Sequence, residues 1–277
     1  MLKYRAAGRQ PAALLCFALG RSKRRTARTI QPGILCFAAI LCLCGTAADA
    51  NVLYDGSTGQ TPDQQGWFYS GGASATQINT STFTAFDSTV PMADQAGYTS
   101  VFHPLMPQMN RGDGFVVRFS VRVVQESHSS VHRAGFSVIA IAQDLKGVEL
   151  AFWENEIWTQ QDSPLFERNA AESVSFDTTA SLTQYELSIL GDSYSLSAAG
   201  MPSLSGTVKD YTAFDHTAAG LLIDPYEIPS FLFFGDATSS GEAAVELSFI
   251  EVVPEPASLL ILMGTGAVLL LKQRRGV

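Results

Sequence analysis

An alternation of apolar and polar side chains over residues 115–124 constrains the fold more than any other feature of the sequence. Every second residue there is large and apolar, and the residues between them are mostly polar: Phe115, Val117, Phe119, Val121 and Val123 against Arg118, Ser120 and Arg122. Successive side chains of a β-strand point to opposite faces, so the segment predicts a strand with one face in a core and one in solvent. Half-solvated strands are typical of antiparallel sheets.

Shorter segments of the same kind recur through the middle of the chain, separated by turn residues. We predict further strands at residues 135–142, 147–153, 156–160, 184–190, 193–198, 204–210, 230–234 and 243–252. Glu154-Asn155 and Gly191-Asp192 each separate two such segments and predict tight hairpins. So many short strands without long helical periodicity favour an all-β fold, an antiparallel β-sandwich or jelly roll, in which residues 52–54 pair with 245–250.

The charge of this middle region argues against nucleic-acid partners. The 277-residue chain has a formal net charge of −8, but residues 51–258 hold 7 Lys and Arg against 25 Asp and Glu, a net charge of −18. Such a domain repels phosphate backbones and anionic lipids. The remaining basic residues lie at the two ends of the chain, eight within residues 1–50 and three within residues 272–275.

The N-terminal end has the order of a secretory signal. Basic residues at 21–28 precede an apolar run at 33–45, and the small residues Ala48-Asp49-Ala50 follow as a cleavage box. We predict a signal peptide over residues 1–50, with an unusually long basic region and a short helix, that directs export through the Sec translocon; a buried helix of a cytoplasmic domain is the alternative. All four cysteines lie before residue 45, so the mature domain has neither disulfides nor thiolate metal sites.

The C-terminal end has three parts in a fixed order. Pro254, Glu255 and Pro256 come first, an apolar run at 258–271 follows, and Lys272, Arg274 and Arg275 come last. The run is at the low limit of length for a membrane helix. Basic residues stay on the cytoplasmic side, so we expect a C-terminal membrane helix that leaves the domain outside. An ordinary anchor helix is the alternative, and it predicts the same topology.

This tail resembles the PEP-CTERM sorting signal, which combines a Pro-Glu-Pro motif, a short hydrophobic helix and a terminal Arg cluster. The resemblance implies a bacterial envelope protein processed by an exosortase, a membrane protease or transpeptidase of bacteria that make extracellular polysaccharide. The expected organisation is a signal peptide at 1–50, a β-sandwich domain at 51–252 and a sorting tail at 253–277.

Segments of the middle domain are similar to concanavalin A-like and laminin G-like domains of bacterial surface proteins. The similarity rests on residues 53–56, 65–67, 147–153 and 233–236. It implies a jelly-roll fold of a kind that often binds glycans or calcium, although a fold alone assigns no function.

Paired carboxylates raise the alternative of a glycan-active enzyme. Glu149, Glu154 and Glu156 bracket the first predicted hairpin, and glycoside hydrolysis needs two such groups. The jelly-roll glucanases place a Glu-x-Asp-x-x-Glu pattern on one strand, which this spacing does not match. We therefore expect no catalytic residue here, and a hydrolase or lyase remains the competing interpretation.

Candidate metal ligands fall into two groups. His128 and His132 have a spacing that brings two ligands together on a helix, but they lie in a predicted loop, and His103 is near them only in sequence. The aspartates of Gly-containing loops, Asp55, Asp63 and Asp236, suit calcium better, because calcium prefers oxygen ligands. Ordinary turns explain the same aspartates, so the chain needs either no cofactor or Ca²⁺.

Exposed aromatic side chains are the best sequence candidates for a glycan contact, because sugar rings stack on them. Trp67, Trp153 and Trp158 are the tryptophans of the chain. Trp153 is flanked by strand residues and is assigned to the core, whereas Trp158 follows the turn and is the surface candidate. The sequence therefore predicts an exported, membrane-anchored or exosortase-sorted envelope protein with a non-catalytic β-sandwich that contacts extracellular polysaccharide.

Overall fold

The computed structural model describes residues 50–72, 75–89, 95–221 and 223–254. The predicted signal peptide up to residue 49 lies outside the described residues. So do the predicted helix at 258–271 and several residues of the tail: Glu255, Pro256, Lys272, Arg274 and Arg275. Within the described part, no helix is long and apolar enough to cross a membrane.

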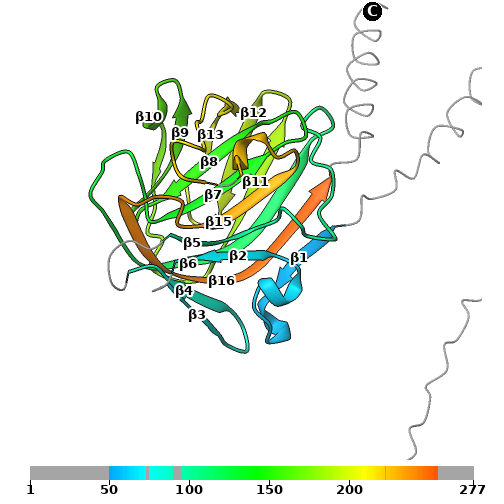
Figure 1. The fold of residues 1–277 in the computed structure, drawn as a ribbon, viewed down its shortest axis with the longest axis vertical. Helices are drawn as coiled ribbons and strands as arrows, with labels where there is room; N and C mark the ends of the chain where they lie inside the picture. Colours follow the sequence, from blue (N-terminus) through cyan, green and yellow to red (C-terminus); the bar gives the residue numbers. More distant parts are fainter. Residues whose placement is uncertain (1–49, 73–74, 90–94, 222, 255–277) are drawn as a thin grey trace, which may run out of the picture. The chain divides into compact units, whose positions relative to one another are not determined.

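Two antiparallel sheets form the fold (Figure 1). The first sheet has the order β13-β12-β11-β6-β16-β4-β3, and β1 also pairs with β16. Its strands are β1 (Asn51–Asp55), β3 (Thr76–Asn79), β4 (Thr84–Asp87), β6 (Phe115–His128), β11 (Thr183–Leu190), β12 (Ser193–Ala198), β13 (Leu204–Thr207) and β16 (Gly241–Pro254).

The second sheet has the order β10-β9-β8-β7-β15-β5-β2, and β14 also pairs with β8. Its strands are β2 (Phe68–Gly71), β5 (Ala96–Thr99), β7 (Phe136–Ile141), β8 (Lys146–Phe152), β9 (Glu156–Asp162), β10 (Leu165–Ser175), β14 (Lys209–Asp210) and β15 (Phe231–Gly235). Three short 3-10 helices lie in the connections, at η1 (Gly56–Thr58), η2 (Asp63–Gln65) and η3 (Pro225–Glu227).

The core lies between the two sheets, where their apolar faces meet. The apolar residues of β6 identified by alternation are all buried, and the polar residues between them are half-exposed. Phe119 of β6 contacts Phe152 of β8 and Phe234 of β15, with ring centroids 6.3 and 5.3 Å apart. The predicted antiparallel β-sandwich is therefore confirmed.

The last strand, β16, is a central strand of the first sheet. It pairs with β6 over its whole length and, on its other side, with β4 and then β1. Asn51 lies opposite Val252, which confirms the predicted pairing of the first and last strands. The side chains of Val245, Leu247, Ile250 and Val252 are at most 1% exposed. At about 2 kcal/mol for each, their burial contributes on the order of a whole domain's stability.

Both predicted hairpins are present, but several strands were not predicted. β8 and β9 flank Glu154-Asn155, and β11 and β12 flank Gly191-Asp192, where Gly191 has a φ of 59° that suits a tight turn. The segment at 204–210 divides into β13 and β14. The strands missing from the prediction are β2, β3, β4, β5 and β10, which are short or interrupted by register shifts.

Candidate functional site

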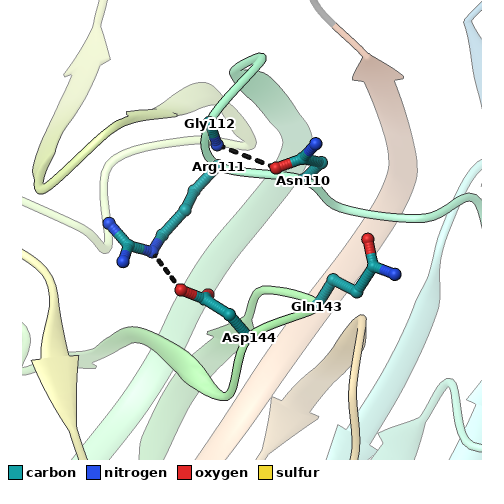
Figure 2. Close-up of a pocket in the computed structure, with 5 residues that line it drawn as sticks. All are labelled: Asn110, Arg111, Gly112, Gln143 and Asp144. Carbon is teal, nitrogen blue, oxygen red and sulfur yellow. Dashed lines mark hydrogen bonds and ion pairs between the residues drawn. The ribbon is translucent and has the colours of Figure 1, made fainter.

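Two clefts that share Gln143 lie at the end of the sandwich where β16 ends. The larger, of about 470 Å³, is lined by Asn110, Arg111, Gly112, Gln143 and Asp144 (Figure 2). The smaller, of about 290 Å³, is lined by Ser100, Val101, His103, Met106, Pro107, Gln108, Gln143, Ile228, Pro229 and Ser230. We call the two together the end groove.

The turn that precedes β6 builds the larger cleft. Its carbonyl at Asn110 accepts hydrogen bonds from the backbone N–H groups of Asp113 and Gly114, and Gly114 has a φ of 90°. The N–H of Gln143 donates to the carbonyl of Met109 at 2.9 Å, which ties the β7–β8 loop to this turn. Phe115, the next residue of β6, lies opposite Pro254. The groove is therefore next to the first residue of the Pro-Glu-Pro motif.

Arg111 is held by acidic partners in the groove. Its guanidinium contacts Asp144 at 2.7 Å and Asp192 at 2.5 Å, and it donates to the carbonyl of Gly191. The hydrogen bond to Asp144 is the main cause that raises the pKa of Arg111. By contrast, the exposed amide of Gln143 has no hydrogen-bond partner among the described residues, and it extends away from Asp144 in Figure 2.

Two exposed aromatic rings lie near the smaller cleft in the chain, since Phe102 stands between its lining residues Val101 and His103. Phe102 is 73% exposed and Phe68 is 52% exposed, and their rings meet edge to face with centroids 6.5 Å apart. Leu105, in the same segment as Phe102, is 58% exposed. His103 lies between Phe102 and Leu105 in the chain but is buried, with its Nε2 3.0 Å from the carbonyl of Leu53. Burial favours the neutral ring and lowers the pKa of His103.

Trp158, the predicted surface tryptophan, is fully buried, so that prediction was wrong. It packs against Ala134, Ala151 and Trp153 on the outer face of the second sheet. Trp153, assigned to the core, is half-buried, and its ring stacks on His128 at 4.3 Å and lies under the Arg168 guanidinium at 5.0 Å. Trp67 is also buried and donates to the carbonyl of Leu53.

The three glutamates of the enzyme alternative do not converge. Glu149 is fully buried on β8, Glu154 is exposed in the turn, and Glu156 on β9 is ion-paired with Arg168. The pairing of Leu150 with Thr159 places Glu149 opposite Gln160, four residues along β9 from Glu156. At about 3.3 Å per residue this separates Glu149 from Glu156 by roughly 13 Å, which exceeds the roughly 5–9.5 Å between the carboxyl groups of glycosidases.

Glu149 nevertheless belongs to a buried polar cluster that sequence reasoning missed. Tyr226 donates to its Oε2 at 2.5 Å, and Nη1 of Arg133 lies 3.8 Å from its Oε1. Oε1 of Glu149 and Nη1 of Arg133 have no hydrogen-bond partner in the described residues. Burial, followed by the charge of Glu149, raises the pKa of Tyr226 and keeps it protonated as a donor.

The aromatic ring of Phe166 packs against this cluster. Phe166, in β10, contacts Tyr211, Phe214 and Tyr226, and the Arg133 guanidinium lies 5.1 Å from its ring centroid. Phe166 has a φ of 60°, which is unusual for a bulky residue. No sequence signal brings these residues together, because they come from β10, the β6–β7 loop and the segment after β14.

Most of the predicted metal ligands already have protein partners. Asp55 caps η1 by accepting from the N–H of Ser57, and Asp63 begins η2. Asp236 is buried and accepts from the N–H of Thr238 and the hydroxyl of Ser88. His128 contacts Glu126, and His132 accepts from the N–H of Arg168. Among the described residues no group of three His, Cys, Asp or Glu could hold a metal; calcium binding stays a prediction.

Comparison with protein families identifies the tail. Residues 252–275 match the model of the PEP-CTERM protein-sorting motif. No curated protein matches the sequence. Among solved structures, a protein of unknown function with a galectin-like fold from Bacillus subtilis is 10% identical, with a TM-score of 0.45, and the match covers 73% of this chain and 96% of that one.

Two further structures illustrate the range of such neighbours. The carbohydrate esterase vb_24B_21 from the Shiga toxin-encoding bacteriophage phi24B is 11% identical, with a TM-score of 0.46 over 74% of this chain and 98% of that one. The exoplasmic/lumenal domain of VIP36, bound to Ca²⁺ and Man3GlcNAc, is 9% identical, with a TM-score of 0.42 over 74% and 88%. What the chain itself carries is a PEP-CTERM sorting motif, the mark of an exosortase substrate, joined directly to an antiparallel β-sandwich.

Proposed function

We propose that this is an exported bacterial envelope protein whose sandwich is non-catalytic and binds extracellular polysaccharide in the end groove. Export runs through the Sec translocon, and an exosortase then processes the tail, so the domain works outside the cytoplasmic membrane, anchored or released. The match of residues 252–275 to the PEP-CTERM protein-sorting motif supports the placement.

The observation that carries polysaccharide binding is the exposed Phe68–Phe102 pair, of which Phe102 is flanked in the chain by Val101 and His103 of the end groove. An aromatic surface stacks on sugar rings, and neighbouring amides that lack protein partners, such as that of Gln143, hydrogen-bond to hydroxyl groups. The groove's one guanidinium is already neutralised by Asp144 and Asp192. Together with the net charge of −18 on residues 51–258, this favours a neutral polysaccharide over an anionic one.

Truncating the aromatic surface is expected to weaken binding. We expect Phe102→Ala to lower the affinity for the host's extracellular polysaccharide roughly tenfold, equivalent to about 1.4 kcal/mol, and Gln143→Ala to lower it several-fold. Gln184→Ala, at an exposed amide on β11 away from the groove, is the matched control. The measurement is affinity electrophoresis of the purified protein; equal retardation of all four proteins contradicts this site.

A glycan lyase or hydrolase is the second candidate function. The observation in its favour is the buried carboxylate of Glu149, which has one oxygen without a hydrogen-bond partner in the described part, beside Arg133 and Tyr226. Clusters of this kind are candidate catalytic sites. Glu149 is fully buried, however, with Phe166 packed against Arg133 of the cluster, and neither cleft of the end groove is lined by Glu149.

A further inference from the structure

We propose that Arg111 is a positioning residue of the end groove: it fixes the β7–β8 loop that carries Gln143, and salt weakens the binding of a neutral polysaccharide by screening that contact. This rests on the polysaccharide-binding half of the proposed function. Arg111 acts through the loop rather than on the sugar.

Arg111 joins the turn before β6 to loops of both sheets. Towards the second sheet, its Nε lies 2.7 Å from Oδ2 of Asp144 in the β7–β8 loop (Figure 2). Towards the first sheet, its Nη1 lies 2.5 Å from Oδ1 of Asp192 and donates to the carbonyl of Gly191 at 2.7 Å, both in the β11–β12 hairpin. The N–H of Gly191 also donates to the carbonyl of Arg111 at 2.7 Å. Hydrogen bonds to the backbone of Gly191 therefore fix Arg111 on the hairpin side, and its charge is available to hold Asp144.

The β7–β8 loop needs such support from outside. Leu145 has a φ of 68°, a left-handed conformation that is unfavourable for a side chain of this size. The loop is tied to the turn by the N–H of Gln143, which donates to the carbonyl of Met109 at 2.9 Å, and by the carboxylate of Asp144. The contact with Arg111 therefore helps to set the position of the loop.

The position of this loop matters for binding because Gln143 lines both clefts and is the neighbour of Asp144 in the chain. A ligand that must order a loop loses affinity to the cost of that ordering. When only a fraction of the molecules holds the amide of Gln143 in place, the apparent affinity falls by that fraction. Losing the contact between Arg111 and Asp144 therefore weakens binding without the loss of any contact to the sugar.

The contact is open to screening by salt. The side chain of Arg111 is 19% exposed and that of Asp144 is 48% exposed. Ion pairs at such positions weaken as the ionic strength rises. A neutral polysaccharide has no charge of its own to be screened. A fall of its affinity with salt therefore reports on an ion pair within the protein.

The test measures retention of the purified protein on the immobilised neutral fraction of the host's extracellular polysaccharide. The salt is varied from about 0.01 M to about 1 M NaCl, over which the Debye length falls from roughly 30 Å to roughly 3 Å. We expect the wild type to bind roughly three- to fivefold more weakly at high salt. Arg111→Gln should bind at low salt as weakly as the wild type does at high salt, and its affinity should not fall further when salt is added.

Each other outcome overturns the inference. If the affinity of the wild type does not change with salt, or if Arg111→Gln loses affinity with salt as the wild type does, no ion pair of Arg111 controls the groove. If Arg111→Gln loses binding entirely at both salt concentrations while remaining folded by urea unfolding, Arg111 contacts the sugar directly. A wild type that does not bind at either concentration overturns the inference together with the polysaccharide-binding half of the proposed function.

Two further variants make the test independent of the folding of Arg111→Gln. Asp144→Asn removes the carboxylate at an exposed loop position and should reproduce the weak, salt-independent binding, and the double variant with Arg111→Gln should lose nothing more. Additive losses contradict action through Asp144. Arg118→Gln is the matched control, because Arg118 also joins two carboxylates, those of Glu186 and Glu251, but does not line the groove. It should keep the affinity and the salt response of the wild type.

Discussion

The free energy of unfolding of the wild-type domain is expected to fall by up to about 4 kcal/mol between pH 4 and pH 8, and replacing Asp236 by Asn is expected to abolish this fall. Burial raises the pKa of Asp236 from 3.8 to about 7, against the opposing effect of its hydrogen bonds to Thr238 and Ser88. A carboxyl with a raised pKa binds a proton in the folded state that the unfolded chain has released. The contribution of this proton to stability is therefore complete below about pH 4 and is lost as the pH rises through 7.

The magnitude follows from the size of that shift. A difference of about three pKa units corresponds to roughly 4 kcal/mol at most. The charged groups that face Asp236 are Arg133, which lowers its pKa, and Glu242, which raises it. Asn at this position still accepts from Thr238 and donates to Ser88, whose hydroxyl then turns to the carbonyl of Ala243 at 3.3 Å. The variant therefore keeps its hydrogen bonds at every pH.

Urea unfolding at pH 4.5, 6 and 8 is the measurement. The free energy of unfolding of the wild type should fall across this range relative to Asp236→Asn, and the variant should be the more stable protein at pH 8. Asp63→Asn, at an exposed position, is the matched control and should follow the wild type. The prediction is contradicted if the free energies of unfolding of the wild type and Asp236→Asn change with pH in parallel.

The sandwich was predictable from sequence because its strands follow the alternation of a half-buried sheet. In β6 the apolar residues have a period of two, and β16 continues the pattern through Val245 and Leu247. β10 has no such pattern, since its register shifts after Leu165 and after Asn169. Trp158 was misplaced for that reason: Ser173 of the unpredicted β10 pairs opposite it, and Ala134 and Trp153 cover its ring.

The candidate sites were not predictable because tertiary structure alone assembles them. The end groove combines the turn before β6 with the β7–β8 loop, and nothing in the spacing of Asn110 and Gln143 brings them together. The cluster around Glu149 draws Arg133 and Tyr226 from segments on either side of β8 in the sequence. Of these functional features, only the Pro-Glu-Pro motif was recognisable in the sequence, because the motif is defined by the order of its residues rather than by the fold.

Truncating Glu149 to Ala is expected to destabilise the domain by about 3 kcal/mol, because it leaves two buried partners without their acceptor. Tyr226 loses the carboxylate to which it donates, and the half-buried Arg133 loses the only carboxylate within 4 Å of it in the described structure. Breaking a buried pair by removing one partner costs more than the pair contributes. Glu149→Gln, which keeps an acceptor for Tyr226, should cost about 1 kcal/mol. Glu167→Ala, at an exposed position of β10, should change the free energy of unfolding by less than about 0.5 kcal/mol.

The Gln variant also decides between the two candidate functions, because it stays folded while losing the carboxylate. If Glu149 has only a structural role, the wild type releases no products from a panel of polysaccharides, and Glu149→Gln binds polysaccharide as tightly as the wild type. If the wild type depolymerises a polysaccharide and the folded Glu149→Gln protein does not, the sandwich is an enzyme and the non-catalytic proposal fails. Phe166→Ala sharpens the comparison, because it removes the ring packed against Arg133 and opens space beside the cluster. The change should raise the rate of such an enzyme and leave a purely structural cluster without turnover.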